Sequence, residues 1–159
     1  MREGKDALFI DHYATTHQVI VVSGQTGGFV PLYCTAHGKA LIADLGLAEL
    51  RATFGAAPLH GYTRRTIVSV HQLAKSCAAI KAQGFTIDDR EFREDVRCLA
   101  APIRDKDSVI VASIGISAPL TRFPEERYST AAQQVYEAAT QISAILGAEA
   151  RTSAQSNGA

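Results

Sequence analysis

The sequence predicts a mixed α/β (α+β) fold in which helices cover an antiparallel sheet. Segments rich in β-branched residues come in consecutive pairs, and the helical segments lie between the pairs rather than after every strand. The chain has 159 residues, of which 47% are hydrophobic, enough to bury the core of one domain. This order of elements favours hairpins covered by helices over a doubly wound parallel sheet.

The N-terminal part is predicted to form three short strands. Residues 7–12 and 18–22 are apolar or β-branched segments bounded by polar residues. The loop SGQTGG at residues 23–28 leads to a third strand at residues 29–33. We expect this strand at a sheet edge, because Pro31 has no N–H to donate.

Three helices are predicted to follow. Thr35 is a suitable N-cap for a helix over residues 36–45, and a shorter helix is expected over residues 48–54. A third helix covers residues 71–83 and ends at Gly84. Its apolar residues recur at helical spacing: Leu73, Cys77 and Ile80.

The C-terminal part is predicted to hold two long strands, residues 96–104 and 108–117, joined by a tight turn. Pro124 then opens a helix that runs to about residue 146. Its predicted apolar stripe consists of Val135, Ala138, Ala139, Ile142, Ile145 and Leu146. Residues 148–159 show no periodicity and are predicted to be a disordered tail.

Composition and charge exclude several classes of function. The 16 basic and 16 acidic residues balance, so no electrostatic footprint for nucleic acid or an anionic membrane is present. The chain has neither a membrane-spanning apolar segment nor a signal-peptide core. Its three cysteines form no CxxC motif or disulfide framework, which predicts a reducing, cytoplasmic location.

Nucleotide, metal and catalytic motifs receive little support. The stretch HGKA at residues 37–40 lacks the first glycine and the Ser or Thr of a P-loop. The five histidines have no metal-ligand spacing, so neither a metal nor another cofactor is predicted. Cys98 has no base close to it in sequence, although a tertiary contact could supply one, and a Cys98-dependent enzyme therefore stays as an alternative.

Strand alternation indicates where a pocket could form. Side chains alternate between the faces of a strand, so Val96 and Cys98 share one face. In the next strand, Ser113, Gly115 and Ser117 share a face that is small and polar, which leaves room for a ligand and supplies hydroxyls. The helix start at Thr35 adds unpaired backbone N–H groups, and Gly38 is expected to let a ligand approach the backbone.

Three stretches of the sequence together resemble a known family. They are PLYCTAHGKALIA at residues 31–43, GFTIDDREFREDVRCLAAPIRD at residues 84–105 and ASIGISAPLTRF at residues 112–123. They are similar to the effector-binding domain of the IclR family of bacterial transcriptional regulators. The residues at the family's spacing are Gly84, Asp88, Glu91, Cys98, Leu99, Ala100, Ile103 and Asp105.

The resemblance implies a GAF-like fold with a central antiparallel sheet of about six strands flanked by helices. It also implies a pocket for a small organic or aromatic carboxylate. Carried over by position, the pocket residues are Ala36, His37, Gly38, Asp88, Cys98 and Ser117. The sequence departs from the family pattern at three positions: Asp95, Arg104 and Gly115.

The resemblance further predicts the organisation and partners of the parent protein. Residues 1–147 would form the effector-binding domain without its first strand. Operator DNA would be bound through an N-terminal winged helix-turn-helix that the chain lacks. A homodimer or homotetramer is expected, because two-fold pairing suits palindromic operators. The alternative to this family is a GAF-like sensor of another signalling protein.

The predicted pocket residues also suggest the chemistry of the effector. The helix start would attract a carboxylate, and His37 would add positive charge below a pKa of roughly 6.5. Asp88 would repel a second carboxylate and accept a hydrogen bond from a hydroxyl. A monocarboxylate with a hydroxyl or keto group is therefore expected to bind better than a dicarboxylate.

Overall fold

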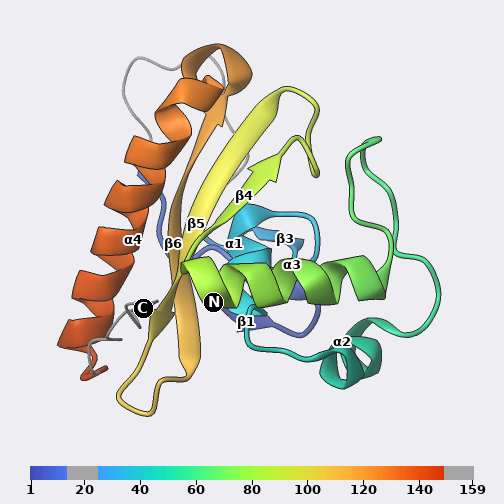
Figure 1. The fold of residues 1–159 in the computed structure, drawn as a ribbon, viewed down its shortest axis with the longest axis horizontal. Helices are drawn as coiled ribbons and strands as arrows, with labels where there is room; N and C mark the ends of the chain where they lie inside the picture. The colour runs from blue at the N-terminus through green and yellow to red at the C-terminus, as the bar shows by residue number, and fades with distance from the viewer. Residues whose placement is uncertain (14–24, 149–159) are drawn as a thin grey trace, which may run out of the picture.

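The structure is a computed structural model that describes residues 1–13 and 25–148, and it confirms the mixed α/β fold (Figure 1). Six strands in the described residues agree with the number expected, but they are divided between two antiparallel sheets of three strands each. The chain leaves the first sheet at Pro31 and enters a helix that packs on the second sheet. Three helices therefore lie between the two sheets in sequence.

The first sheet pairs three short strands, β1 (Arg2–Glu3), β2 (Asp6–Leu8) and β3 (Phe29–Pro31). Both β2 and β3 are shorter than predicted. Among the described residues, the bonds that continue the pairing after β2 join Phe9 to the turn at Gly27 and Gly28, where Gly27 has φ +84°. The strand predicted at residues 18–22 lies outside the described residues.

Three helices follow, α1 (Ala36–Leu41), α2 (Leu47–Phe54) and α3 (Val70–Gln83). The predicted caps are confirmed: the Thr35 hydroxyl accepts the N–H of Gly38 at 3.1 Å, and Gly84 ends α3 with φ +84°. The helix at Ala36 is shorter than predicted. After Leu41 the backbone bonds connect residues three apart, so the α-helix tightens into turns.

The second sheet contains β4 (Thr86–Asp89), β5 (Val96–Arg104) and β6 (Ile110–Pro119). The bounds predicted for β5 are confirmed, whereas β6 begins and ends two residues later than predicted. The Asp105 carboxylate accepts the N–H groups of residues 107 and 109, which extends the turn before β6. The prediction missed β4 because aspartate is rare in strands, and pairing with β5 holds it in place.

The last helix, α4 (Tyr128–Ile145), follows two 3₁₀ turns, Leu120–Arg122 and Glu125–Arg127, and runs along one face of the second sheet (Figure 1). Its core residues include Val135 and Ala139, as predicted. The ends of the predicted stripe are wrong, since Ile145 is 83% exposed and Leu146 is 45% exposed. Ser143 is buried instead, because its hydroxyl accepts the backbone N–H of Arg104. No helix within residues 1–13 and 25–148 is long and apolar enough to cross a membrane.

Helix α1 packs against the opposite face of the second sheet through small side chains. Ala36 and Ala40 contact Ala100, with Cys98 beside them. A side chain on Gly38 would place its Cβ 2.4 Å from the Leu32 carbonyl oxygen, so glycine is required there by the chain's own backbone. Similarly, a Cβ at Gly115 would lie 2.2 Å from the carbonyl oxygen of Leu99. Close packing of backbone therefore explains both glycines.

Candidate ligand-binding site

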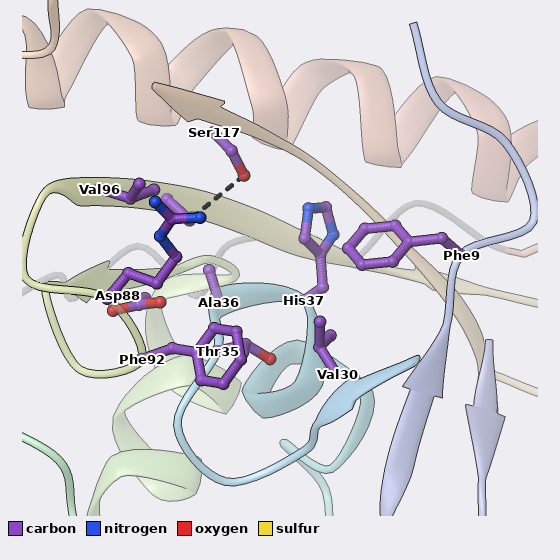
Figure 2. Close-up of a pocket in the computed structure, with 11 residues that line it drawn as sticks. Phe9, Val30, Thr35, Ala36, His37, Asp88, Phe92, Val96 and Ser117 are labelled. Atoms are coloured by element: carbon purple, nitrogen blue, oxygen red, sulfur yellow. Dashed lines mark hydrogen bonds between the residues drawn. The ribbon is translucent and has the colours of Figure 1, made fainter. Parts of the chain in front are cut away.

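A cavity lies between the start of α1, the first sheet and the loop end of β4, β5 and β6 (Figure 2). Its volume, measured as the space open to the centre of a water molecule, is about 20 Å³. This is enough to hold water but narrow for a larger ligand. The lining residues are Phe9, Val30, Thr35, Ala36, His37, Asp88, Phe92, Arg93, Val96, Cys98 and Ser117.

Most of the predicted pocket residues meet in this cavity. Five of the six line it: Ala36, His37, Asp88, Cys98 and Ser117. Cys98 and Ser117 are direct partners across β5 and β6, and the Ser117 hydroxyl donates to the Cys98 sulfur at 3.0 Å. Gly38 does not line the cavity, because it faces the backbone of Leu32. The geometric prediction is thus met at five positions, and a ligand-binding role for them stays a prediction.

His37 does not supply the positive charge expected of it. Its ring lies against Phe9 in an edge-to-face contact with centroids 5.3 Å apart (Figure 2). Burial lowers the pKa of His37 to about 4, with a smaller contribution from the N-terminal ammonium group. The imidazole is therefore neutral at pH 7, and it cannot attract a carboxylate by charge.

Asp88 is a buried carboxyl group whose charge depends on pH near neutrality. It is 3% exposed, and one carboxyl oxygen accepts the N–H of Glu91 at 2.6 Å. Burial raises the pKa of Asp88 to about 7, although the bond from Glu91 opposes the shift. Because its side chain reaches the cavity, the group can accept a hydrogen bond from a ligand when charged and donate one when protonated.

A buried ion pair behind the cavity fixes the segment that carries Asp88. The ammonium of Lys39, a residue that is 2% exposed, contacts the Glu91 carboxylate and donates to the carbonyl oxygen of Ile87 at 3.0 Å. These contacts connect α1 to β4 and to the loop that follows it. The part of the polar approach around Asp88 and Glu91 is therefore held by buried contacts, whereas Glu94 and Asp95 are exposed.

The chemistry of Cys98 does not suit a nucleophile. Burial, with the nearby Asp88 carboxylate as a second cause, raises the pKa of the Cys98 thiol to about 12. A catalytic thiol needs the opposite shift, because the thiolate is the reactive form. Within the described part of the chain, no group of three or more His, Cys, Asp or Glu side chains could hold a metal ion.

Several lining residues were not predicted. Phe9 directly follows β2 and Val30 lies in β3, and the sequence of these segments gives no sign that they fold over α1. Phe92 and Arg93 belong to a charged run that is typical of solvated surface. The sequence signal that could have identified Phe92 and Arg93 as lining residues is their position between Asp88 and Val96.

Comparison with known proteins places the chain in a family. Residues 1–144 match the family described as bacterial transcriptional regulator IclR C-terminal. The chain belongs to the IclR family. The resemblance seen in the sequence is confirmed, and the match supports it over a GAF-like sensor of another signalling protein.

Individual relatives support this assignment over most of the chain. The transcriptional repressor IclR of Escherichia coli is 32% identical over 142 residues, which is 89% of this chain and 52% of the relative. The HTH-type transcriptional regulator KdgR of Escherichia coli is 36% identical over 143 residues, 90% of this chain and 54% of the relative. This chain therefore spans about half the length of these relatives.

A solved structure shows the same fold. The crystal structure of the Agobacterium tumefaciens repressor BlcR superposes with a TM-score of 0.80 at 31% identity, and the match covers 94% of this chain and 58% of that one. The GAF-like fold expected of an IclR C-terminal domain is confirmed by this likeness.

Proposed function

We propose that this chain is the effector-sensing domain of an IclR-type transcriptional regulator and that it binds a small organic carboxylate in the cavity beside α1. The observation that carries the proposal is the convergence of Asp88, Cys98 and Ser117 on one cavity in a chain of this family. Matching relatives are named as transcriptional repressors or regulators, several of them as HTH-type. In the parent protein, effector binding would control operator binding by a helix-turn-helix domain outside this sequence.

The polar groups of the cavity support a compact ligand with an acid and a hydroxyl or keto group. The N–H groups of Ala36 and His37 have no hydrogen-bond partner among the described residues. Ser117 adds a hydroxyl, and Asp88 adds a carboxyl group of variable charge. The small volume favours a ligand of few atoms, and an aromatic carboxylate would require the wall to move.

Discrimination between mono- and dicarboxylates should depend on pH. Above pH 7 the charged Asp88 repels a second carboxylate, so a monocarboxylate is favoured. Below pH 7 the protonated group donates a hydrogen bond, and the preference weakens. The original expectation of a fixed preference is therefore replaced by a pH-dependent one.

A thermal-shift screen tests the proposal. Two- to five-carbon mono- and dicarboxylates, with and without 2-hydroxy or 2-oxo groups, are compared with their neutral amides at pH 6 and pH 8. A ligand at one hundred times its Kd should stabilise the chain by about 2.7 kcal/mol. Stabilisation by amides alone, or by no member of the series, would contradict the assignment of a carboxylate effector.

The proposed oligomeric state and cellular location follow from the same family assignment. We expect a homodimer or homotetramer in the cytoplasm, since regulators of palindromic operators are symmetric. Light scattering at tens of micromolar protein checks the assembly, and a monomeric mass would count against it.

A further inference from the structure

The positive charge on the cavity wall is concentrated on one residue, Arg93. Among the described residues that line the cavity, Arg93 is the only lysine or arginine. His37 is neutral at pH 7, because burial lowers its pKa to about 4. Lys39 is close by but engaged by Glu91 and by the Ile87 carbonyl oxygen. An anion entering the cavity therefore meets a single cationic side chain.

Asp95 holds the guanidinium of Arg93 by one edge. The Nε of Arg93 donates to one carboxylate oxygen of Asp95 at 3.0 Å, and Nη2 donates to the other at 2.9 Å. A guanidinium carries five N–H donors, so this bidentate contact leaves donors on the other edge. Nη1 has no hydrogen-bond partner among the described residues. Asp95 itself does not line the cavity.

The Arg93–Asp95 pair is partly exposed, at 37% and 60% of the two side chains. Exposed ion pairs are weak, because water screens them and both side chains lose conformational freedom. A ligand carboxylate is able to use the unengaged edge of Arg93 or to compete with Asp95 for the engaged one. In both cases the negative charge of Asp95 opposes the binding of the ligand carboxylate to Arg93.

We propose that Arg93 is the residue that selects an anionic effector, and that Asp95 weakens this selection by neutralising the guanidinium. The inference rests on the proposed function, and it identifies a cationic anchor that differs from the helix start predicted from the sequence. Arg93 lies in the loop between β4 and β5, close in sequence to Phe92 and Val96, which both line the cavity. The acid group of the effector would therefore face this loop, and its hydroxyl or keto group would face Ser117 and Asp88.

Two substitutions with opposite expected effects test the inference. Calorimetry at pH 8 uses the carboxylate that binds best in the thermal-shift series, together with its neutral amide. Arg93→Gln should weaken carboxylate binding by about tenfold or more, since a hydrogen bond to a charged group is lost. Asp95→Asn should tighten it by about two- to fivefold. Binding of the amide should change by less than about twofold in both variants.

Salt and a matched arginine provide the controls. Raising the salt from about 50 to about 500 mM should weaken carboxylate binding by the wild-type chain more than by Arg93→Gln, because salt screens the charge interaction. Arg65→Gln is the control, because Arg65 also pairs with an aspartate, Asp89, and is exposed, but does not line the cavity. Carboxylate binding by Arg65→Gln should equal that of the wild type.

The outcomes separate the two proposals. Unchanged carboxylate binding by Arg93→Gln, or weaker binding by Asp95→Asn, would overturn the role of Arg93 while leaving the effector-sensing function intact. An equal loss for carboxylate and amide would assign Arg93 to the shape of the loop and not to charge selection. If no carboxylate binds the wild-type chain, the effector class and the role of Arg93 both fall.

Discussion

The two faces of the β4–β5–β6 sheet use alternate residues of the same strands and differ in almost every property. The face toward α4 buries apolar side chains of the strands, among them Leu99 and Ile103, against α4 residues such as Val135. The face toward α1 carries Ala100, Cys98 and Ser117, and it borders the cavity and the buried Lys39–Glu91 pair. Adjacent residues such as Cys98 and Leu99 therefore lie in opposite environments.

This difference indicates a division of labour within one strand. Burial of apolar area on the α4 side stabilises the fold at about 25 cal/mol per Å². Small side chains on the α1 side leave space and expose polar atoms, which reduces their contribution to stability but permits recognition. The sheet is thus a stable support on one face and a candidate sensor on the other.

The largest expected effect separates the two faces by stability. Leu99→Ala removes a side chain that is 0% exposed and should lower the free energy of unfolding by about 2–5 kcal/mol. Cys98→Ala, one residue away, should cost about 1 kcal/mol or less, because the thiol borders an existing cavity and is small. Urea denaturation of both variants measures the difference. Equal losses would show that the two faces share the stabilising role.

A smaller effect concerns the pH dependence that Asp88 gives to the α1 face. Its pKa is raised from 3.8 to about 7, so the folded chain retains a proton that the unfolded chain has lost. The contribution to stability is complete below about pH 4 and is lost as the pH rises through about 7. The amide introduced by Asp88→Asn does not titrate, and its oxygen can still accept the N–H of Glu91.

The expected result is that the stability of Asp88→Asn relative to the wild type rises as the pH is raised from 5 to 8. Between pH 5 and pH 8, the difference in free energy of unfolding between the variant and the wild type should change by on the order of 2 kcal/mol. Urea titrations of both chains at half-unit steps from pH 5 to pH 8 check it. Parallel stability curves would mean that Asp88 is charged throughout this range.

The contrast between the faces could be predicted from the sequence because it depends on strand alternation. β5 has nine consecutive strand residues, and its bounds and facing pattern follow from period two. The meeting of Cys98 with Ser117 follows from pairing the two strands as a hairpin. Local pattern thus sufficed for the β5–β6 hairpin, but not for β4, which pairs directly with β5 and was missed.

What the sequence did not predict depends on contacts between distant segments. The loss of charge on His37 arises from burial beneath residues such as Phe9, which is remote in sequence. Gly38 was assigned to a ligand because its neighbour Leu32 could not be placed before the fold was known. Arg93 was missed because a charged run is ordinarily solvated, and the nearby cavity that gives it a role forms in three dimensions.

The smallest expected effect tests whether a single atom on the α1 face of the sheet, the hydroxyl oxygen of Ser117, binds the effector. Ser117→Ala removes the hydroxyl that lines the cavity and should weaken effector binding by about 0.5–1.5 kcal/mol, the range of a neutral hydrogen bond. Ser113 is the matched control, because it lies on the same face of β6 but donates to the carbonyl oxygen of His37 at 3.2 Å and does not line the cavity. Ser113→Ala should therefore leave the Kd unchanged in calorimetry with the best carboxylate of the screen. If Ser113→Ala weakens binding as much as Ser117→Ala, the effect comes from the packing of α1 on the sheet and not from a bond to the ligand.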